Sequence, residues 1–332
     1  MILVILIIAV ALLFDFLNGF HDSANSIATV VATRVLRPQQ AVLMAAFANF
    51  IAAFFLTTAV AATIGKGIID PHAILPLTVL AGVIGASIWN ILTWYIGLPV
   101  SSSHALIGGL IGAALVQNGT TALLFGGIAK TVVFMFIAPM VGFLGAHVFS
   151  IVTMRVVGTH SRRKVNHMFA KLQIISSFFY SMGHGANDAQ KTMGIIALTL
   201  FSNHLIGEKF YVPVWVIFSS HAAIALGTYF GGWRIVKTMG TKIIRLHPFE
   251  GFCAEASSAA TLFLTSYLGI PVSTTHVISG SIVGVGTAQN AKQVRWITTR
   301  RIFIAWILTI PCAMLFGSAL RILFSILTQA SG

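Results

Sequence analysis

Two acidic residues interrupt strongly apolar stretches of this sequence, and each lies in a similar polar motif. Asp22 belongs to GFHDSAN (residues 19–25), and Asp188 belongs to GANDAQK (residues 185–191). A bilayer interior disfavours an isolated carboxylate, so such acids normally have a partner and a function. The pair predicts a cation-coupling site in which Na⁺ or H⁺ binds at Asp22 and Asp188. Three neighbouring side chains could complete an oxygen shell around the cation: Ser23, Asn25 and Asn187.

Hydroxyl groups gather in a second pair of motifs, GLPVSSSH (residues 97–104) and GIPVSTTH (residues 269–276). Gly and Pro favour a break in a helix, and Ser or Thr can cap the helix that begins after the break. Free N–H groups at a helix start, with hydroxyl donors beside them, can bind an oxyanion such as phosphate or sulfate. The hydroxyls could instead only cap buried helices, but their occurrence in two matching motifs favours a ligand site. The predicted substrate-binding residues are Ser101, Ser102, Ser103, Ser273, Thr274 and Thr275, with Asn25, Asn187 and Lys191 beside them.

Other ionisable side chains in or near these motifs have several candidate roles. Lys191 matches Asn25 between the acidic motifs and follows Asp188 by three residues, so one helical face can hold the acid and the base. Its ammonium group could neutralise Asp188 or contact the anion, and we hypothesise that it replaces one cation that a symmetric site would bind. Candidates for proton transfer or gating, each of which could equally be a packing or interfacial residue, are His21, His104, His184, His276, Asp15 and Glu255.

The composition shows which elements must position these groups. Of the 332 residues, 57% are hydrophobic and only 8% are charged, and several apolar runs reach about 20 residues, the length of a membrane-spanning helix. The runs do not alternate polar and apolar residues as a transmembrane β-barrel would. We therefore predict an all-α polytopic membrane protein. Its apolar segments are residues 2–33, 40–64, 73–117, 121–154, 172–201, 211–232, 250–290 and 302–328.

The two hydroxyl motifs divide the segments 73–117 and 250–290. About 13 apolar residues follow each motif, too few to cross a bilayer as a helix, so each segment is predicted to be a re-entrant hairpin. This arrangement places fifteen of the 20 Lys and Arg residues in inside loops and two in outside loops, as the positive-inside rule requires. It predicts a multi-pass protein of the plasma (inner) membrane with both termini extracytoplasmic. The net charge of +13 then reflects loops that meet anionic membrane lipid, not nucleic acid.

The chain also repeats itself. Residues 97–112 and 269–284 share seven identities in 16 positions, and the two acidic motifs align at a similar offset. The charge pattern makes the two halves opposite in orientation, as in inverted-repeat transporters whose broken helices meet near the midplane. Each repeat is predicted to have a first span broken at its acidic motif, where Gly19 would loosen the helix. The predicted units are a first repeat at 1–155, a basic cytoplasmic linker at 156–171 and a second repeat at 172–332.

The sequence resembles the inorganic phosphate transporter (PiT) family, bacterial type, over nearly its whole length. The resemblance rests on DFLNGFHDSANSIATVVATRVL (15–36), YSMGHGANDAQKTMG (180–194) and the two Pro-Val-Ser hairpins. It implies inverted repeats, helical hairpins and symport of inorganic phosphate with Na⁺ or H⁺, without a further cofactor. It also implies that the acids, amides and hydroxyls named above surround ion and substrate. The form GHGANDAQK resembles bacterial members often regarded as proton-coupled, some of which carry metal–phosphate complexes.

Other functions have weaker support. A sulfate or related oxyanion permease of the same fold would use the same motifs. An oxyanion channel could also have inverted repeats and two half-helices, but intramembrane acids favour ion coupling. An enzyme acting on phosphate esters or lipids would need a catalytic motif, and the HExxH, GxSxG and P-loop patterns are absent from the sequence. A homodimer is an open expectation for the assembly.

Overall fold

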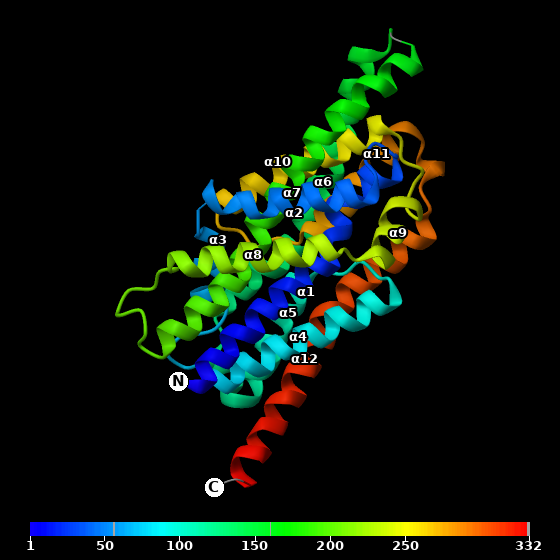
Figure 1. Ribbon diagram of the computed structural model, residues 1–332. Coiled ribbons are helices and arrows are strands. Elements are labelled where there is room, and N and C mark those ends of the chain that lie inside the picture. Colours follow the sequence, from blue (N-terminus) through cyan, green and yellow to red (C-terminus); the bar gives the residue numbers. More distant parts are fainter. Residues whose placement is uncertain (56, 160, 331–332) are drawn as a thin grey trace.

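The computed structural model describes residues 1–55, 57–159 and 161–330, and its elements are helices (Figure 1). Within these residues the strand-like pairing is limited to an isolated bridge between Ile69 and Leu123. The α-helices are α1 (Ile2–Ala32), α2 (Pro38–Ile51), α3 (Ala59–Gly67), α4 (Pro76–Ile96), α5 (Ser102–Asn118), α6 (Phe125–Val157), α7 (Arg162–Ser202), α8 (Val214–Phe230), α9 (Trp233–Thr241), α10 (Pro248–Tyr267), α11 (Thr274–Asn290) and α12 (Trp296–Ala330). The short 3-10 helices are η1 (Ala52–Phe54), η2 (Gly119–Ala122) and η3 (Ala291–Gln293).

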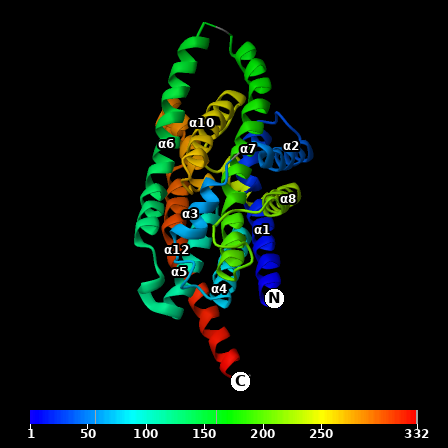
Figure 2. The ribbon, with the colours of Figure 1, turned by 90° about the vertical axis from the view of Figure 1, so that its left-hand side faces the viewer.

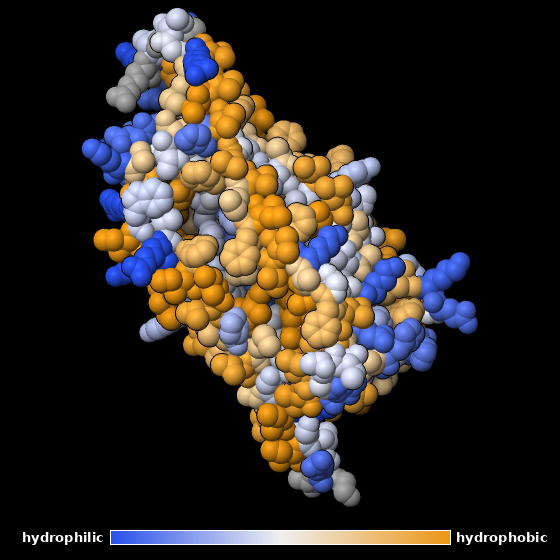
Figure 3. Space-filling view, turned by 180° about the vertical axis from the view of Figure 1, so that it is seen from behind, coloured by the Kyte–Doolittle hydropathy of each residue, from blue (hydrophilic) through white to orange (hydrophobic). Residues whose placement is uncertain are grey.

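The helices have the length and surface of a multi-pass membrane protein. Among the described residues, five helical stretches are long and apolar enough to cross a membrane, and seven are if each of two bent helix pairs counts as one span. Figure 3 shows hydrophobic side chains spread over the middle of one face, with hydrophilic side chains gathered toward opposite edges. The predicted all-α polytopic membrane fold is confirmed.

The order of elements is the same in the two halves of the chain. Each half has a long first helix (α1, α7), a bent pair (α2–α3, α8–α9), a helical hairpin (α4–α5, α10–α11) and a long last helix (α6, α12). The last helix of each half packs against the hairpin of the other, α6 on α11 and α12 on α5. Figure 2 shows α1 and α7 running in opposite directions, with both termini at the same end of the molecule.

The first helix of each half is continuous, so the break predicted at each acidic motif is wrong. α1 continues through Asp22 and α7 continues through Asp188. The glycines of these motifs allow close helix packing instead of loosening a helix. A Cβ atom on Gly19 would lie 2.1 Å from the Ile224 carbonyl oxygen of α8, and one on Gly185 would lie 2.7 Å from the backbone of α2. Small residues at such contacts let membrane helices approach closely.

The breaks lie instead in the second span of each half. The axes of α2 and α3 differ by 81°, and those of α8 and α9 differ by 73°. The apolar segment 40–64 is therefore divided by a bend, and segment 211–232 ends at a bend into α9. Gly231 lies at this second bend with φ +71°, a left-handed conformation that glycine adopts at no steric cost.

The basic linker predicted at residues 156–171 is mostly helical. α6 ends at Val157 and α7 already begins at Arg162, and both helices extend beyond the rest of the molecule at one end (Figure 2). Arg and Lys, each of which occurs twice in this segment, are strong helix formers. The segment can therefore continue α7 outside the apolar part of the protein.

α4 and α5 form one hairpin, and α10 and α11 form the other. A matching pair of side chains closes the open end of each: Thr78 donates to Gln117, and Gln289 donates to Glu250. At the turn of the first hairpin, Gly97 has φ +73°, which again suits glycine. The two helical hairpins predicted from the sequence are confirmed, whereas their re-entrance into the membrane stays a prediction, because residues Ser102–Ala122 of the first hairpin are long and apolar enough to cross a membrane.

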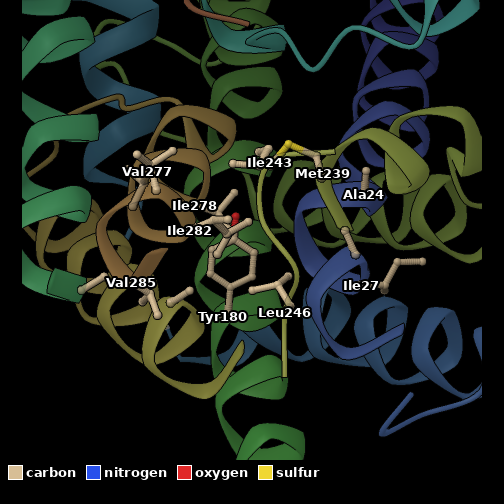
Figure 4. Close-up of a cluster of buried hydrophobic side chains, with 14 of the residues drawn as sticks. Ala24, Ile27, Tyr180, Met239, Ile243, Leu246, Val277, Ile278, Ile282 and Val285 are labelled. Atoms are coloured by element: carbon tan, nitrogen blue, oxygen red, sulfur yellow. The ribbon is translucent and has the colours of Figure 1, made fainter. Parts of the chain in front are cut away.

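Two hydrophobic cores lie on either side of a polar layer. The first core includes Tyr180 and Ile278, which lie side by side in Figure 4, and residues 24–30 of α1. The second core includes the buried apolar side chains of residues 4–14 of α1. The buried polar part of α1, with Asp22, lies between the two. The acidic motifs are thus held at mid-depth of the molecule.

Gly19→Ala is expected to destabilise the protein through the α1–α8 contact. The new methyl group would overlap the Ile224 carbonyl oxygen, and overpacking of this kind typically costs about 1–3 kcal/mol. The thermal unfolding midpoint of the purified protein in detergent should fall. Gly126→Ala is the matched control, because nothing lies within 4 Å of a Cβ atom at Gly126. Equal midpoints for the two variants would contradict the tight contact.

Candidate functional site

The two predicted acids meet in the polar layer. Carboxylate oxygens of Asp22 and Asp188 and a ring nitrogen of His184 all lie within 4.8 Å of one another. His184 Nε2 is 3.6 Å from Asp188 Oδ2, and His21 Nδ1 is 2.7 Å from Asp22 Oδ1. All four residues are at most 2% exposed. Acids from α1 and α7, far apart in the sequence, therefore form one buried acidic site.

The turns of the two hairpins meet each other beside the acids. The rings of His104 and His276, which occupy equivalent positions in the two hydroxyl motifs, have centroids 4.8 Å apart. Thr275 Oγ1 donates to the Val100 carbonyl oxygen of the other hairpin at 3.0 Å. The N-termini of α5 and α11 therefore lie close together. Because each helix start carries partial positive charge and free N–H groups, this junction suits an anion.

The first hydroxyl of each hairpin motif is a helix cap. Ser101 Oγ accepts a hydrogen bond from the His104 backbone N–H, and Ser273 Oγ accepts one from the His276 N–H, both at 3.2 Å. Capping thus accounts for these two hydroxyls. Ser102 Oγ, by contrast, is buried without a hydrogen-bond partner among the described residues, so it is available to a ligand.

Lys191 and Asn25 make equivalent contacts in the two halves. Lys191 Nζ donates to Ser103 Oγ of the first hairpin, and Asn25 Nδ2 donates to Thr275 Oγ1 of the second at 2.8 Å. Lys191 Nζ also donates to Asp188 Oδ1 at 2.5 Å. The acid of the second half therefore has a built-in ammonium partner. Among the described residues, no Lys or Arg forms an ion pair with the acid of the first half.

Oxygen ligands for a cation are present around the acids. The side-chain amide oxygens of Asn18, Asn25 and Asn187 are buried and accept no hydrogen bond within the described part of the chain. Thr274 Oγ1 lies 3.4 Å from Asp188 Oδ2. An unpartnered buried acceptor is costly, and hard cations prefer carboxylate, amide and hydroxyl oxygens. These groups could hold a transported Na⁺.

Ser23 does not join this cluster. Its Oγ accepts a hydrogen bond from the Gly232 N–H at 2.6 Å and donates to the Phe20 carbonyl oxygen at 2.9 Å. The hydroxyl is engaged in the contact between α1 and the start of α9, not directed at a cation. Its neighbour in the sequence, Asp22, faces the opposite half.

Glu255 and Asp15 occupy separate buried positions. The carboxylate of Glu255 accepts hydrogen bonds from three side chains of α1 and α7, namely Thr29 at 2.5 Å, Ser176 at 2.5 Å and Gln173 at 3.1 Å. Asp15 precedes Asp22 on α1 by about two helical turns, and its carboxylate oxygens accept no hydrogen bond from the described residues. Their gating or proton-transfer roles stay predictions.

Two polar side chains at the site were not predicted from the sequence. Asn18 Nδ2 lies 3.4 Å from Asp188 Oδ2, and the Tyr180 hydroxyl donates to the Thr274 carbonyl oxygen at 3.3 Å. Asn18 does have a signal, because the offset that aligns the two acidic motifs also pairs it with His184. Tyr180 has no such signal, since its contact depends on how α7 packs against the hairpin.

Each bent half-helix connects an acid-bearing helix to a hairpin turn. α9 is tied at its start to Ser23, the residue after Asp22. Farther along α9, Thr238 Oγ1 donates to the Gly97 carbonyl oxygen in the turn of the first hairpin at 2.9 Å. α9 therefore links the acid of the first half to the hairpin of the same half.

α3 makes the equivalent links around the second acid. The N–H groups of Val60 and Ala61 donate to Gln190 Oε1, two residues after Asp188, at 2.9 and 3.2 Å. Thr63 Oγ1 donates to the Gly269 carbonyl oxygen in the turn of the second hairpin at 2.7 Å. Both hairpin turns are thus held by a threonine on a short helix that begins beside an acid.

Thr238→Val and Thr63→Val are expected to slow transport more than they lower stability. Each change removes one hydroxyl with little change in volume, and a single hydrogen bond contributes about 0.5–1.5 kcal/mol. We expect the initial uptake rate in proteoliposomes to fall about three- to tenfold. Thr121→Val is the control, since Thr121 makes a similar hydrogen bond to a helix carbonyl oxygen at the surface. Wild-type rates in both hairpin variants would exclude a role for these links.

The site is closed to its surroundings. Asp22, Asp188, Lys191, Ser103 and Thr275 are at most 3% exposed. An ion and an anion can therefore enter or leave only after helices or hairpins move. The buried acids, the paired helix N-termini and the closed form together fit a binding site that opens and closes.

Comparison with known proteins identifies the family. The model of the phosphate transporter family matches residues 18–317. The chain belongs to the phosphate transporter family. It is 53% identical to a probable low-affinity inorganic phosphate transporter of Rhizobium meliloti over 94% of this chain and 93% of that protein. It is 43% identical to a protein of the same description from Bacillus subtilis over 96% of each chain.

A solved structure agrees with this membership. The sodium-dependent phosphate transporter superimposes with a TM-score of 0.88 at 26% sequence identity, covering 98% of this chain and 100% of that one. The resemblance to phosphate transporters seen in the motifs is confirmed. As a member of the phosphate transporter family, the protein is a membrane transporter and not an enzyme.

Proposed function

We propose that the protein imports inorganic phosphate across the plasma membrane by cation symport, with alternating access to a site between its two halves. The observation that carries this proposal is that the N-termini of α5 and α11 meet two buried acids in one closed polar layer. Helix N-termini favour an oxyanion, whereas the acids favour a cation. When the oxyanion and the cation are both bound, much of the charge of the site is neutralised. The loaded site can then move through a low-dielectric environment at a lower free-energy cost.

Phosphate is expected to bind between the N-termini of α5 and α11, with Lys191 as its charged partner. Lys191 Nζ touches both hairpins, because it donates to Ser103 Oγ and to the Val272 carbonyl oxygen, the latter at 2.9 Å. An ammonium group forms charge-assisted hydrogen bonds with phosphate. Ser102 is the first residue of α5, and its hydroxyl, which has no hydrogen-bond partner among the described residues, supplies a further donor.

The transported cation is expected beside Asp22. This acid has no ammonium partner among the described residues, whereas Asp188 is paired with Lys191. Na⁺ is supported by the oxygen ligands around the site and by the name of the similar solved structure, a sodium-dependent phosphate transporter. The contact between His21 and Asp22 would instead suit H⁺. Separate ion gradients distinguish the two.

The two halves, 1–155 and 172–332, are proposed to be inverted repeats with the linker in the cytoplasm. The common order of elements and the opposite directions of α1 and α7 (Figure 2) support this assignment. The positive-inside rule then places both termini outside the cytoplasm. A metal–phosphate complex as cargo and a homodimeric assembly stay predictions from the sequence.

Uptake of labelled phosphate into proteoliposomes tests the proposal. Na⁺ and pH gradients are imposed separately, and sulfate is added as a competitor. Accumulation should depend on at least one of the two gradients and should exceed the external phosphate concentration. Uptake that persists unchanged after both gradients collapse would show a channel, and equal competition by sulfate would show a broader oxyanion permease.

A further inference from the structure

A cationic cavity lies at the far end of α1 from the N-terminus. Its volume is about 400 Å³, and it is bounded by the end of α1, the end of α9, the α9–α10 loop and the segment that precedes α12. Its lining includes three arginines and one histidine, namely Arg34, Arg245, Arg295 and His247. Arg34 follows Asp22 by twelve residues, or about 18 Å along a helix, so the cavity is separate from the transport site.

The positive charge of this cavity is not compensated by acids. Its lining contains no Asp or Glu, and within the described residues no ion pair involves Arg34, Arg245 or Arg295. The positive-inside rule explains why basic residues occur at this end of the protein. It does not require that arginines from three segments far apart in the sequence gather around one hollow.

Backbone geometry holds two of the arginines at the cavity. Arg34 has φ +62° just after α1, where a helix end commonly takes glycine. The backbone N–H of Arg295 donates to the Ile243 carbonyl oxygen at 2.9 Å, which ties the segment before α12 to the α9–α10 loop. The hydroxyl-bearing residues Thr33 and Thr241 also belong to the lining.

We propose that this cavity binds a phosphate-bearing anion, either a soluble phosphate compound or the headgroup of an anionic lipid. Guanidinium groups form planar, bidentate hydrogen bonds with phosphate oxygens, and they stay charged at any physiological pH. Three of them around one hollow match the charge of a phosphoryl group with two or three negative charges. The volume accommodates a group larger than a single phosphate.

Occupancy of the cavity would restrain transport. The anion would join the end of α1 to His247, the N-cap of α10, and to the segment before α12. α1 carries Asp22 and α10 begins the second hairpin, so an anion that joins them would resist movement of one relative to the other when the closed site opens. This inhibitory role depends on the proposed transport function, whereas anion binding does not.

Pyrophosphate binding to the protein in zwitterionic-lipid nanodiscs tests the site by calorimetry. The wild type should bind saturably, and the triple variant Arg34→Gln/Arg245→Gln/Arg295→Gln should bind at least about tenfold more weakly. The double variant Arg245→Gln/Arg295→Gln, which leaves Arg34 and its left-handed backbone unchanged, should also bind pyrophosphate more weakly. The control triple variant Arg163→Gln/Arg300→Gln/Arg301→Gln removes the same charge outside the cavity and should bind like the wild type.

Three outcomes would overturn the proposal: equal binding by the wild type and the cavity variants, equal loss in the control variant, or loss of pyrophosphate binding in Asp22→Asn. The lipid composition then distinguishes the two sources of ligand. Tenfold weaker pyrophosphate binding in nanodiscs with phosphatidylglycerol would identify a lipid headgroup as the occupant. Unchanged binding would identify a soluble phosphate compound.

The inhibitory role has its own readout. Pyrophosphate is enclosed in proteoliposomes on the membrane side to which the cavity opens. It should lower the initial rate of phosphate uptake about threefold or more in the wild type, but not in the cavity triple variant. Unchanged uptake by the wild type would overturn inhibition. If calorimetry shows binding while the wild-type protein transports no phosphate, the transport proposal fails and the anion site stands.

Discussion

Asp22→Asn is expected to reduce concentrative phosphate uptake to background, a loss of about 10- to 100-fold or more. Asn has nearly the same shape as Asp but lacks the charge that holds a cation. Asp22 is 2% exposed, and its carboxylate contacts His21 at 2.7 Å and Thr275 at 3.5 Å. The measurement is labelled phosphate accumulation in proteoliposomes under Na⁺ and pH gradients.

Two further variants show whether this loss is specific. Glu208→Gln removes an exposed acid in the α7–α8 loop and should transport like the wild type. Asp188→Asn should lose accumulation as well, but it leaves the Lys191 ammonium buried without its partner, which typically destabilises by about 3–5 kcal/mol. The double variant Asp188→Asn/Lys191→Asn should restore folding without restoring accumulation. Full accumulation in Asp22→Asn would refute the assignment of this acid.

Lys191→Asn is expected to increase the dependence of uptake on external cation. The change makes the second half resemble the first, in which Asn25 occupies the equivalent position. Without its ammonium partner at 2.5 Å, Asp188 would need a cation from solution. The number of coupling ions required per phosphate, measured as the Hill coefficient of uptake for that ion, should rise by about one. Half-maximal uptake should also require at least about tenfold more cation, because a hydrogen bond to a charged group typically contributes about 1.5–3 kcal/mol.

The reciprocal variant is the control for this effect. Asn25→Lys places an ammonium beside Asp22, so the dependence on external cation should fall. Lys191→Arg keeps the charge and should change the cation dependence less than Lys191→Asn. If uptake by Lys191→Asn shows the same cation dependence as the wild type, the built-in ammonium does not replace a transported ion.

Much of the architecture could be predicted because it depends on local composition and on the repeat. Apolar runs predicted the helices, and Gly-x-Pro-Val followed by hydroxyls predicted the turns of both hairpins. The breaks were placed in the wrong spans for a physical reason. Gly19 looked like a helix breaker, but glycine within an apolar helix also permits close packing, and only the position of Ile224 on α8 distinguishes the two.

The sequence by itself determined that this is a helical membrane protein with paired acids, paired hydroxyl motifs and an unmatched Lys191. Those features follow from residue type, spacing and self-similarity, which need no knowledge of distant contacts. Only the tertiary structure decided which groups share the site. It brought Asn18 to Asp188 and Lys191 to the opposite hairpin, and it turned Ser23 away toward Gly232. These contacts depend on how the helices rotate and cross when their apolar faces pack, and that packing involves residues far apart in the chain.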